Sequence, residues 1–278
     1  MVKDNSIALV LSGGGARGLA HIGILKVLDQ LGIRISAIGG CSMGGLIASL
    51  YASGKSVGEI EKIALKYSST REIVKLVDLT PNHKGFILSQ KLRSFLSKIV
   101  DKDVNIEDLK IPLFMNAVNL ATGKEEILDR GNLLNAIHST TAVPGFISPF
   151  VDKDRILADG GVVNNLPVSI MRTKTSRPIL AIDVHQSLSS FPISGDASNP
   201  YPKSRFPEFL KEFYLAEIIK GRILTDLNLS NNPPDLLISP EIDPNISFFL
   251  GFQKVNDLIE AGILSALENK ENIISLVS

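Results

Sequence analysis

Residues 38–47 read IGGCSMGGLI and place Ser42 between two glycines, directly after an apolar run. The pattern Gly-x-Ser-x-Gly, here Gly40 to Gly44, is typical of a nucleophile elbow, a sharp turn between a strand and a helix that exposes a serine. A tight turn whose serine caps the next helix has the same pattern. The surrounding residues therefore have to decide between the two interpretations.

The flanking residues indicate alternating strands and helices. Residues 7–12 are a short apolar run, typical of a strand buried on both faces, and residues 19–32 carry apolar side chains three or four positions apart. A second apolar strand is expected over 33–38, and a second helix that includes residues 46–51. The order strand, helix, strand, helix predicts a βαβ unit with a parallel sheet.

Beyond residue 54, strands and helices no longer alternate regularly in the predicted pattern. Residues 57–100 have an amphipathic helical pattern, and further strands are expected over 113–119, 156–158 and 178–184. Helices near 208–229 and 252–270 enclose the short strand LLISP. The sequence therefore predicts an α/β fold: a three-layer sandwich around a mainly parallel central sheet.

We expect a single domain over residues 1–278, because the chain is long enough for one large core and short for two. Its catalytic core is predicted over 6–186, and its C-terminal helices and one strand over 208–278. Between them, residues 187–207 contain four prolines and many serines, which predicts a loop. A loop of that length is typically a lid, a binding loop or a flexible segment.

Composition excludes several classes of protein. Lys plus Arg and Asp plus Glu both number 29, so no net charge favours nucleic acid or an anionic membrane. The single cysteine, Cys41, excludes an internal disulfide, and no Cys/His cluster has metal-ligand spacing, so we expect no structural zinc. The uncharged stretch 35–53 is dense in glycine and serine and is interpreted as buried core. These features predict a cytoplasmic protein.

The stretch GGGARG at 13–18 fits two kinds of binding loop. It contains Gly13-x-Gly15-x-x-Gly18 between a strand and a helix, as in dinucleotide-binding folds. That function needs an acidic residue at the end of the second strand, and RISAIGGCSMG at 34–44 has none, which argues against NAD or NADP. Successive glycines at a helix N-terminus also direct several N–H groups to one point, as a tetrahedral oxyanion requires.

Arg17 is unusual in this position, because a cation in the first helical turn opposes the helix dipole. We therefore expect Arg17 to contact a carboxylate from elsewhere in the chain or to face an anion. The glycine loop and the serine turn should open at the same edge of the sheet, where ligands bind in such folds.

A nucleophilic serine needs a base, and the residues leave two candidates open. Ser42, Asp159 and His185 follow the chain order of an α/β-hydrolase triad, although an elbow after only one earlier strand argues against that fold. Alternatively, Asp159 in ADGGVVNNLP would accept the serine proton itself, if burial raises its pKa. The other histidines have no obvious catalytic partner: His21, His83 and His138.

Three motifs together, GGGARG at 13–18, GCSMG at 40–44 and DGG at 159–161, resemble the patatin-like phospholipase family. The resemblance extends to GGGARGLAHIGIL at 13–25 and to TAVPGFISPFVDKDRILADGGVVNNLPV at 141–168, and it covers roughly residues 6–185. It implies the three-layer α/β fold of that family and a catalytic dyad in place of a triad.

The resemblance also implies roles for individual residues. Ser42 would be the nucleophile and Asp159 the general base, without metal or cofactor. The oxyanion hole would be formed by Gly13, Gly14 and Gly15, and further motif residues would support the site: Arg17, Gly18, Gly40, Gly44, Gly160 and Gly161. His138 departs from the family pattern, in which a basic residue, commonly arginine, is expected before the small-residue run.

The implied reaction is hydrolysis of a lipid ester through an acyl-serine, of the phospholipase A or lysophospholipase type. Two alternatives remain: an acyltransferase with the same dyad, and a lipid-binding protein without turnover. A phospholipid, lysophospholipid or other lipid ester is the expected partner, with possible peripheral contact to a membrane and none to nucleic acid. Candidate lipid contacts are the basic amphipathic stretch 91–100 and NISFFLGF at 245–252, each of which also fits a packed core element.

Overall fold

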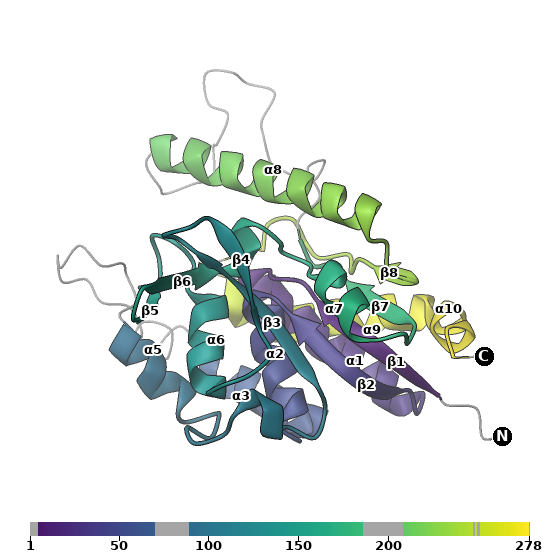
Figure 1. Cartoon of the computed structure of the whole chain (residues 1–278). Coiled ribbons are helices and arrows are strands. Elements are labelled where there is room, and N and C mark those ends of the chain that lie inside the picture. The colour runs from purple at the N-terminus through teal and green to yellow at the C-terminus, as the bar shows by residue number, and fades with distance from the viewer. Residues whose placement is uncertain (1–4, 70–88, 186–207, 247, 249–250, 278) are drawn as a thin grey trace.

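Eight strands form one sheet in the computed structural model of this chain, which describes residues 5–69, 89–185, 208–246, 248 and 251–277 (Figure 1). The strands are β1 (Ser6–Leu11), β2 (Arg34–Gly40), β3 (Leu113–Asn119), β4 (Lys124–Leu128), β5 (Phe150–Asp152), β6 (Arg155–Asp159), β7 (Ile179–Ile182) and β8 (Leu236–Ile238). Their order is β5-β6-β3-β2-β1-β7-β8, and β4 pairs with β3.

The centre of the sheet is parallel and one end is antiparallel. β1 pairs in parallel with β2 and β7, β2 with β3, and β7 with β8. The pairs of β3 with β4 and β6, and of β5 with β6, are antiparallel. The prediction of a mainly parallel α/β sheet is therefore confirmed, with an antiparallel end that the sequence pattern did not indicate.

Helices lie on both faces of the sheet (Figure 1). The α-helices are α1 (Ala20–Gln30), α2 (Ser42–Ala52), α3 (Val57–Tyr67), α5 (Ser89–Leu96), α6 (Leu133–Thr141), α7 (Val168–Lys174), α8 (Glu208–Asn231), α9 (Val255–Glu268) and α10 (Lys270–Ser275). The 3-10 helices of the described ranges are η1 (Gly15–Leu19), η2 (Ile106–Asp108), η3 (Gly160–Val162) and η5 (Gly251–Lys254).

Strand β1 shows why the fold has three layers. Its residues are all buried, and alternate side chains enter two different apolar cores. Ile7, Leu9 and Leu11 belong to the larger core, which includes residues of α1, α2 and α9. Ala8 and Val10 belong to the smaller core, together with Met171 of α7. A strand covered on both faces needs such a continuous apolar run.

The C-terminal part of the chain extends the same sheet. β8 pairs with β7, and α9 packs against α1 with Gly262 and Gly23 at the contact. A β-carbon on either glycine would overlap backbone atoms of the other helix, so the two helices approach closely only because both side chains are absent. The expected loop over 187–207 lies outside the described residues.

The basic amphipathic stretch expected near 91–100 packs on the core. Leu92 and Leu96 of α5 are buried, and Phe95 meets Tyr67 edge to face, with 5.1 Å between the ring centroids. The apolar face of α5 therefore packs on the core, which favours the packed-core interpretation of this stretch over contact with a membrane. None of the helices in the described ranges combines the length and the apolar character needed to cross a bilayer.

Candidate active site

The turn between β2 and α2 has the geometry of a nucleophile elbow. Ser42, the first residue of α2, has φ +52°, a left-handed conformation that L-residues adopt only at a cost. The position before the helix belongs to Cys41, and no side chain caps the helix there, so the capping interpretation of the serine does not hold. The elbow also requires its glycines: a β-carbon on Gly40 would stand 2.7 Å from the carbonyl oxygen of Leu11.

The glycine loop after β1 lies directly beside Ser42. A β-carbon on Gly13 would be 3.2 Å from the Cβ of Ser42. Gly15 has φ +54° and lies against the backbone carbonyl and ring of Phe248, so a side chain at this position would be both strained and obstructed. Phe248 therefore supports the loop from behind, which favours the core-anchor interpretation for this part of 245–252.

Two amides of the glycine loop are available as donors. The N–H of Gly13 donates to the carbonyl of Asn165 at 3.0 Å, and that of Ala16 to the carbonyl of Phe248 at 2.9 Å. Among the described residues, no acceptor is found for the N–H groups of Gly14 and Gly15. Of the three glycines expected to form an oxyanion hole, Gly13 thus has its amide occupied, whereas the amides of Gly14 and Gly15 have no acceptor within the described ranges.

Asp159 ends β6 and reaches the elbow from the other side. Its Oδ1 accepts the N–H of Gly161 at 2.8 Å and lies 3.4 Å from the Sγ of Cys41, and its carboxylate is hydrogen-bonded to the Ser42 side chain. Both Ser42 and Asp159 are only 5% exposed. Burial raises the pKa of Asp159 to about 6, against the opposing effect of these three hydrogen bonds.

Two asparagines hold the Asp159 segment in place, and sequence reasoning did not identify either. Asn116 of β3 is fully buried, lies against Gly160, and donates to the carbonyl of Asn164 at 2.8 Å. Asn165 donates from its side chain to the carbonyl of Gly13 at 3.2 Å, while its Oδ1 lies beside Gly161. The NNLP stretch after DGG contains Asn165, but its partner Gly13 lies 152 positions away in the chain, so the sequence did not indicate the contact.

Arg17 connects the glycine loop to two other segments. Its Nε donates to the carbonyl of Val184 at 3.0 Å and its Nη1 to the carbonyl of Asp243 at 3.4 Å. The side chain is 5% exposed, so it is part of the interior of the fold. Two hydrogen bonds of Arg17 thus go to backbone carbonyls, and its charge also helps to lower the pKa of the Asp243 carboxyl, which agrees with the expected carboxylate from elsewhere in the chain.

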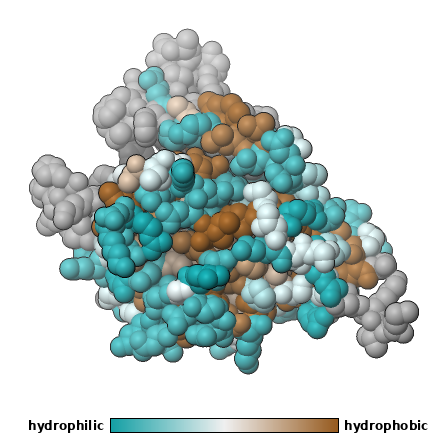
Figure 2. Space-filling view, viewed as in Figure 1, coloured by the Kyte–Doolittle hydropathy of each residue, from teal (hydrophilic) through white to brown (hydrophobic). Residues whose placement is uncertain are grey.

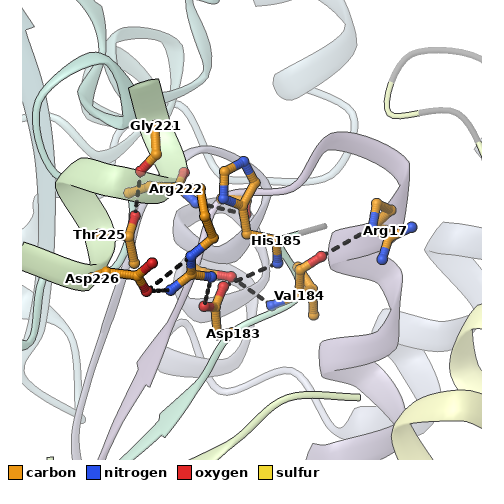
Figure 3. Close-up of polar contacts among 11 residues, drawn as sticks. Arg17, Asp183, Val184, His185, Gly221, Arg222, Thr225 and Asp226 are labelled. Atoms are coloured by element: carbon orange, nitrogen blue, oxygen red, sulfur yellow. Dashed lines mark hydrogen bonds and ion pairs between the residues drawn. The ribbon is translucent and has the colours of Figure 1, made fainter. Parts of the chain in front are cut away.

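The histidine alternative for the base is not supported by the geometry. His185 follows β7 and faces Gly221 of α8, with Asp183 and Arg222 beside it (Figure 3). Burial lowers the pKa of His185, and the cations Arg222 and Arg17 lower it further while Asp183 opposes them. Neither Ser42 nor Asp159 is among the interaction partners found for His185 in the described part of the chain.

The other two described histidines have structural surroundings. His21 of α1 is fully buried with Nε2 2.9 Å from the carbonyl oxygen of Ser12, and burial lowers its pKa to about 4. His138 of α6 is also buried, with Nε2 3.0 Å from the carbonyl oxygen of Ser148 and its ring edge-on to Phe150. Both therefore stay neutral near pH 7, and His83 lies outside the described residues.

A serine on a strand-to-helix elbow, beside backbone N–H donors and a buried carboxylate, has the neighbours that a nucleophilic serine requires. The chain belongs to the patatin-like phospholipase family, whose sequence model matches residues 9–172. The matched range contains all three motifs, so the predicted family is confirmed.

Several curated proteins are similar to this chain over part of their length. Neuropathy target esterase sws of Drosophila melanogaster is 38% identical over 189 residues, which are 66% of this chain and 13% of that protein. Patatin-like phospholipase domain-containing protein 6 of Homo sapiens is 37% identical over 189 residues, 66% of this chain and 14% of that protein. Lysophospholipase NTE1 of Saccharomyces cerevisiae is 28% identical over 95% of this chain and 16% of that protein.

This chain thus spans about one seventh of the length of these relatives. Among solved structures, VipD from Legionella pneumophila matches with a TM-score of 0.58 and 12% identity, over 98% of this chain and 67% of that chain. At that identity, the match supports the fold alone.

Proposed function

We propose that this chain is a serine acyl hydrolase that cleaves lipid esters, of the phospholipase A or lysophospholipase type. Ser42 is the nucleophile, Asp159 the general base, and the amides of Gly14 and Gly15 the oxyanion hole. The observation that carries the proposal is that Ser42, held on an elbow at φ +52°, and the carboxylate of Asp159 are both buried and that the Ser42 side chain acts to lower the pKa of Asp159.

The acylation step follows from these positions. Asp159 takes the proton of the Ser42 hydroxyl while the oxygen attacks the ester carbonyl carbon. The negative charge on the resulting tetrahedral oxygen is stabilised by the N–H groups of Gly14 and Gly15. When the intermediate collapses, the bond to the alcohol oxygen breaks, and protonated Asp159 gives its proton to that oxygen. The products of the step are the free alcohol and an acyl-serine.

Hydrolysis of the acyl-serine reverses the roles of the same groups. Asp159, ionised again, takes a proton from a water molecule that attacks the acyl carbon, and the same two amides hold the second oxyanion. Collapse releases the fatty acid and returns the proton to the oxygen of Ser42. A carboxyl group with a pKa of about 6 suits this exchange near neutral pH, because it both accepts and releases a proton readily.

The proposed substrate class rests on the family and on the names of the relatives, which describe a lysophospholipase and an esterase. A first test is covalent labelling with a fluorophosphonate, followed by a hydrolysis assay on lysophosphatidylcholine. We expect the adduct on Ser42 of the folded chain, and a loss of turnover of about 10³-fold or more in Ser42→Ala and in Asp159→Asn.

His185→Ala is the matched control for the base and is expected to retain most activity, since His185 contacts α8 and not the serine. An active Asp159→Asn variant with an inactive His185→Ala variant, both folded, would contradict the dyad. Products that appear only when an alcohol acceptor is supplied would identify an acyltransferase instead. Lipid binding without any adduct on Ser42 would identify a lipid-binding protein.

Contact with a lipid surface is the second part of the proposal, and α8 supports it. Ile219, Ile223 and Leu227 lie four residues apart on this helix and are 37%, 57% and 56% exposed. Figure 2 shows apolar surface along the helix. The helix also lies beside the Asp159 segment, because the side-chain amide of Asn228 donates to the carbonyl of Val163 at 3.4 Å. These three apolar side chains, next to the proposed site, would contact the lipid micelle or membrane that contains the substrate.

The double variant Ile223→Asp, Leu227→Asp tests this contact. We expect it to sediment less with phosphatidylcholine vesicles, while its turnover of a short soluble ester stays unchanged. The control is Leu264→Asp, Leu267→Asp on α9, where both leucines are similarly exposed, at 51% and 48%. Equal vesicle binding by the two double variants would refute a specific role of α8.

A further inference from the structure

Cys41 stands directly before the proposed nucleophile and contacts the proposed base. It is fully buried, and its Sγ lies 3.4 Å from the Oδ1 of Asp159. The same oxygen accepts the N–H of Gly161, and the carboxylate is also hydrogen-bonded to Ser42. The carboxylate of Asp159 thus meets a hydroxyl, a thiol and an amide, and the proposed mechanism uses only the hydroxyl.

The thiol of Cys41 is a donor to this carboxylate. Burial raises the pKa of Cys41 well above its ordinary value, and the nearby charge of Asp159 raises it further. The sulfur therefore keeps its proton at neutral pH and is a poor nucleophile. A protonated thiol beside an acceptor oxygen donates its S–H, weakly but without competition from water at a fully buried position.

Thr140 of α6 fixes the orientation of this thiol. Its Oγ1 accepts the N–H of Ser42 at 3.0 Å, and its side chain also acts on the Cys41 thiol, whose pKa it lowers against the larger effects of burial and Asp159. Because the hydroxyl has one proton and accepts from Ser42, its proton is available to the sulfur. The hydrogen bonds therefore run from the Ser42 amide to Thr140, from Thr140 to Cys41, and from Cys41 to Asp159.

We propose that Cys41 is a positioning residue for this reaction: its S–H, oriented by Thr140, holds the Asp159 carboxylate ionised and directed at Ser42. The inference rests on the proposed function. A carboxylate buried in an apolar site favours its neutral form, and each donor that it keeps shifts the balance back to the ionised form that accepts a proton.

Burial and three hydrogen-bonding groups account for the shift in the pKa of the Asp159 carboxyl. Among the described residues, only Ser42, Gly161 and Cys41 oppose the effect of burial on the pKa of Asp159. Glu125 of β4 acts on the thiol and adds to the rise in its pKa, after the contributions of burial and Asp159. On α6, burial lowers the pKa of His138, so that helix contributes no charge here. A substitution of Cys41 should therefore change the pKa of Asp159 directly.

The first test compares kcat/KM against pH for the wild type, Cys41→Ala and Cys41→Ser, with a neutral ester substrate. Removing the donor in Cys41→Ala should move the acid limb up by roughly half to one pH unit, whereas Cys41→Ser, which keeps a donor, should leave the limb near its original place. Activity of Cys41→Ala at pH 5 should thus fall by roughly 3- to 10-fold and recover above pH 8. A loss that is equal at every pH would mean a packing role and would overturn the inference.

Thr140→Val and Thr140→Ser give a second pair of variants if Cys41→Ala does not fold. Valine keeps the shape but cannot donate to the sulfur, so its acid limb should move in the same direction as that of Cys41→Ala. Serine keeps the hydroxyl and should restore the wild-type limb. Valine and serine variants with identical profiles would contradict the role of the thiol orientation.

A spectroscopic measurement needs no change at Cys41, because the chain contains a single cysteine. Its S–H stretching band should move to lower frequency as Asp159 ionises, and in Asp159→Asn the band should not respond to pH. A band that ignores pH in the wild type would overturn the inference. This result is separate from the proposed function, which fails if Ser42→Ala and Asp159→Asn remain active, whatever the S–H band does.

Discussion

Asn165 and Gly13 exchange two hydrogen bonds, although they are 152 positions apart in the chain. The N–H of Gly13 donates to the carbonyl of Asn165 at 3.0 Å, and the side-chain amide of Asn165 donates to the carbonyl of Gly13 at 3.2 Å. Because Gly13 touches Ser42 and Asn165 lies beside Gly161, this pair fixes the glycine loop relative to the elbow and to the base.

We therefore expect Asn165→Ala to reduce kcat by about tenfold or more, since loosening the loop misplaces the oxyanion donors beside Gly13. KM should change little, because the alcohol and acyl parts of the substrate do not depend on those donors. Asn272→Ala on the exposed surface of α10 is the control and should behave as wild type. An unchanged kcat in Asn165→Ala would show that the backbone bond alone holds the loop.

The pKa of Asp159 predicts how activity depends on pH. Since burial raises that pKa to about 6, kcat/KM should be constant above pH 7 and fall roughly tenfold per pH unit below about pH 5.5. A neutral ester must be used, so that the substrate itself does not titrate. The test is a profile from pH 4.5 to 9 on protein shown to be folded throughout, and a flat profile through pH 5 would argue against Asp159 as the base.

The same pKa predicts that the base destabilises the folded chain above pH 6. Its folded-state pKa of about 6 lies above the ordinary 3.8, so the native state binds the proton more tightly than the unfolded state. That advantage is complete below about pH 4 and is lost as the pH rises through 6. Asp159→Asn lacks this loss, so its free energy of unfolding relative to wild type should increase by roughly 1–1.5 kcal/mol between pH 5 and pH 8.

Urea unfolding of both proteins at the two pH values measures this difference, and all other titrating groups cancel in the comparison. A stability difference that does not depend on pH would mean that the carboxyl group is not held in a neutral form by burial.

Alanine variants of Gly15 and Gly32 distinguish the cost of backbone strain from that of a steric clash. Both have positive φ, +54° and +67°, but a β-carbon on Gly15 would collide with Phe248, whereas one on Gly32 would meet nothing within 4 Å. Gly32→Ala should therefore lose only about 1 kcal/mol in the free energy of unfolding and keep its activity. Gly15→Ala should lose clearly more and also reduce kcat, because its amide is a proposed oxyanion donor.

Chemical denaturation and initial-rate assays on the two variants check this prediction. Equal losses of stability would show that Phe248 gives way to the new methyl group. A Gly15→Ala variant with full activity would argue against the Gly15 amide as a donor.

The elbow was predictable because its motif is short, with Gly40 and Gly44 each separated from Ser42 by one residue. The crowding that requires these glycines comes partly from the turn and partly from the end of β1, where a β-carbon on Gly44 would meet the carbonyls of Leu11 and Ser12. Strand β1 was equally clear, since burial on both faces demands a continuous apolar run. By contrast, β4 reads KEEIL and is mostly exposed, so no apolar pattern indicates a strand, and its position depends on pairing with β3.

The contacts that complete the site were not predictable for a related reason. Cys41 meets Asp159 across 118 positions, and Thr140 meets Ser42 across 98. The residue types do not predict such contacts, because buried cysteine and threonine residues also occur in cores without any function. The surroundings of the two candidate bases, Asp159 and His185, likewise depend on contacts that only the folded chain defines.

The position of Arg222 has a consequence for how α8 behaves. Its guanidinium bonds Asp226 on the same helix and Asp183 after β7, with Nη1 2.5 Å from the carboxylate of Asp183, which is only 3% exposed (Figure 3). Removing one partner of such a pair leaves a buried charge without compensation, at a cost of about 3–5 kcal/mol.

The next residue, Val184, supplies the carbonyl that holds Arg17 of the glycine loop. Adjacent residues of one short segment thus anchor both the helix with the apolar row and the loop that presents the oxyanion donors. Two consecutive residues, Asp183 and Val184, therefore connect α8 to the glycine loop.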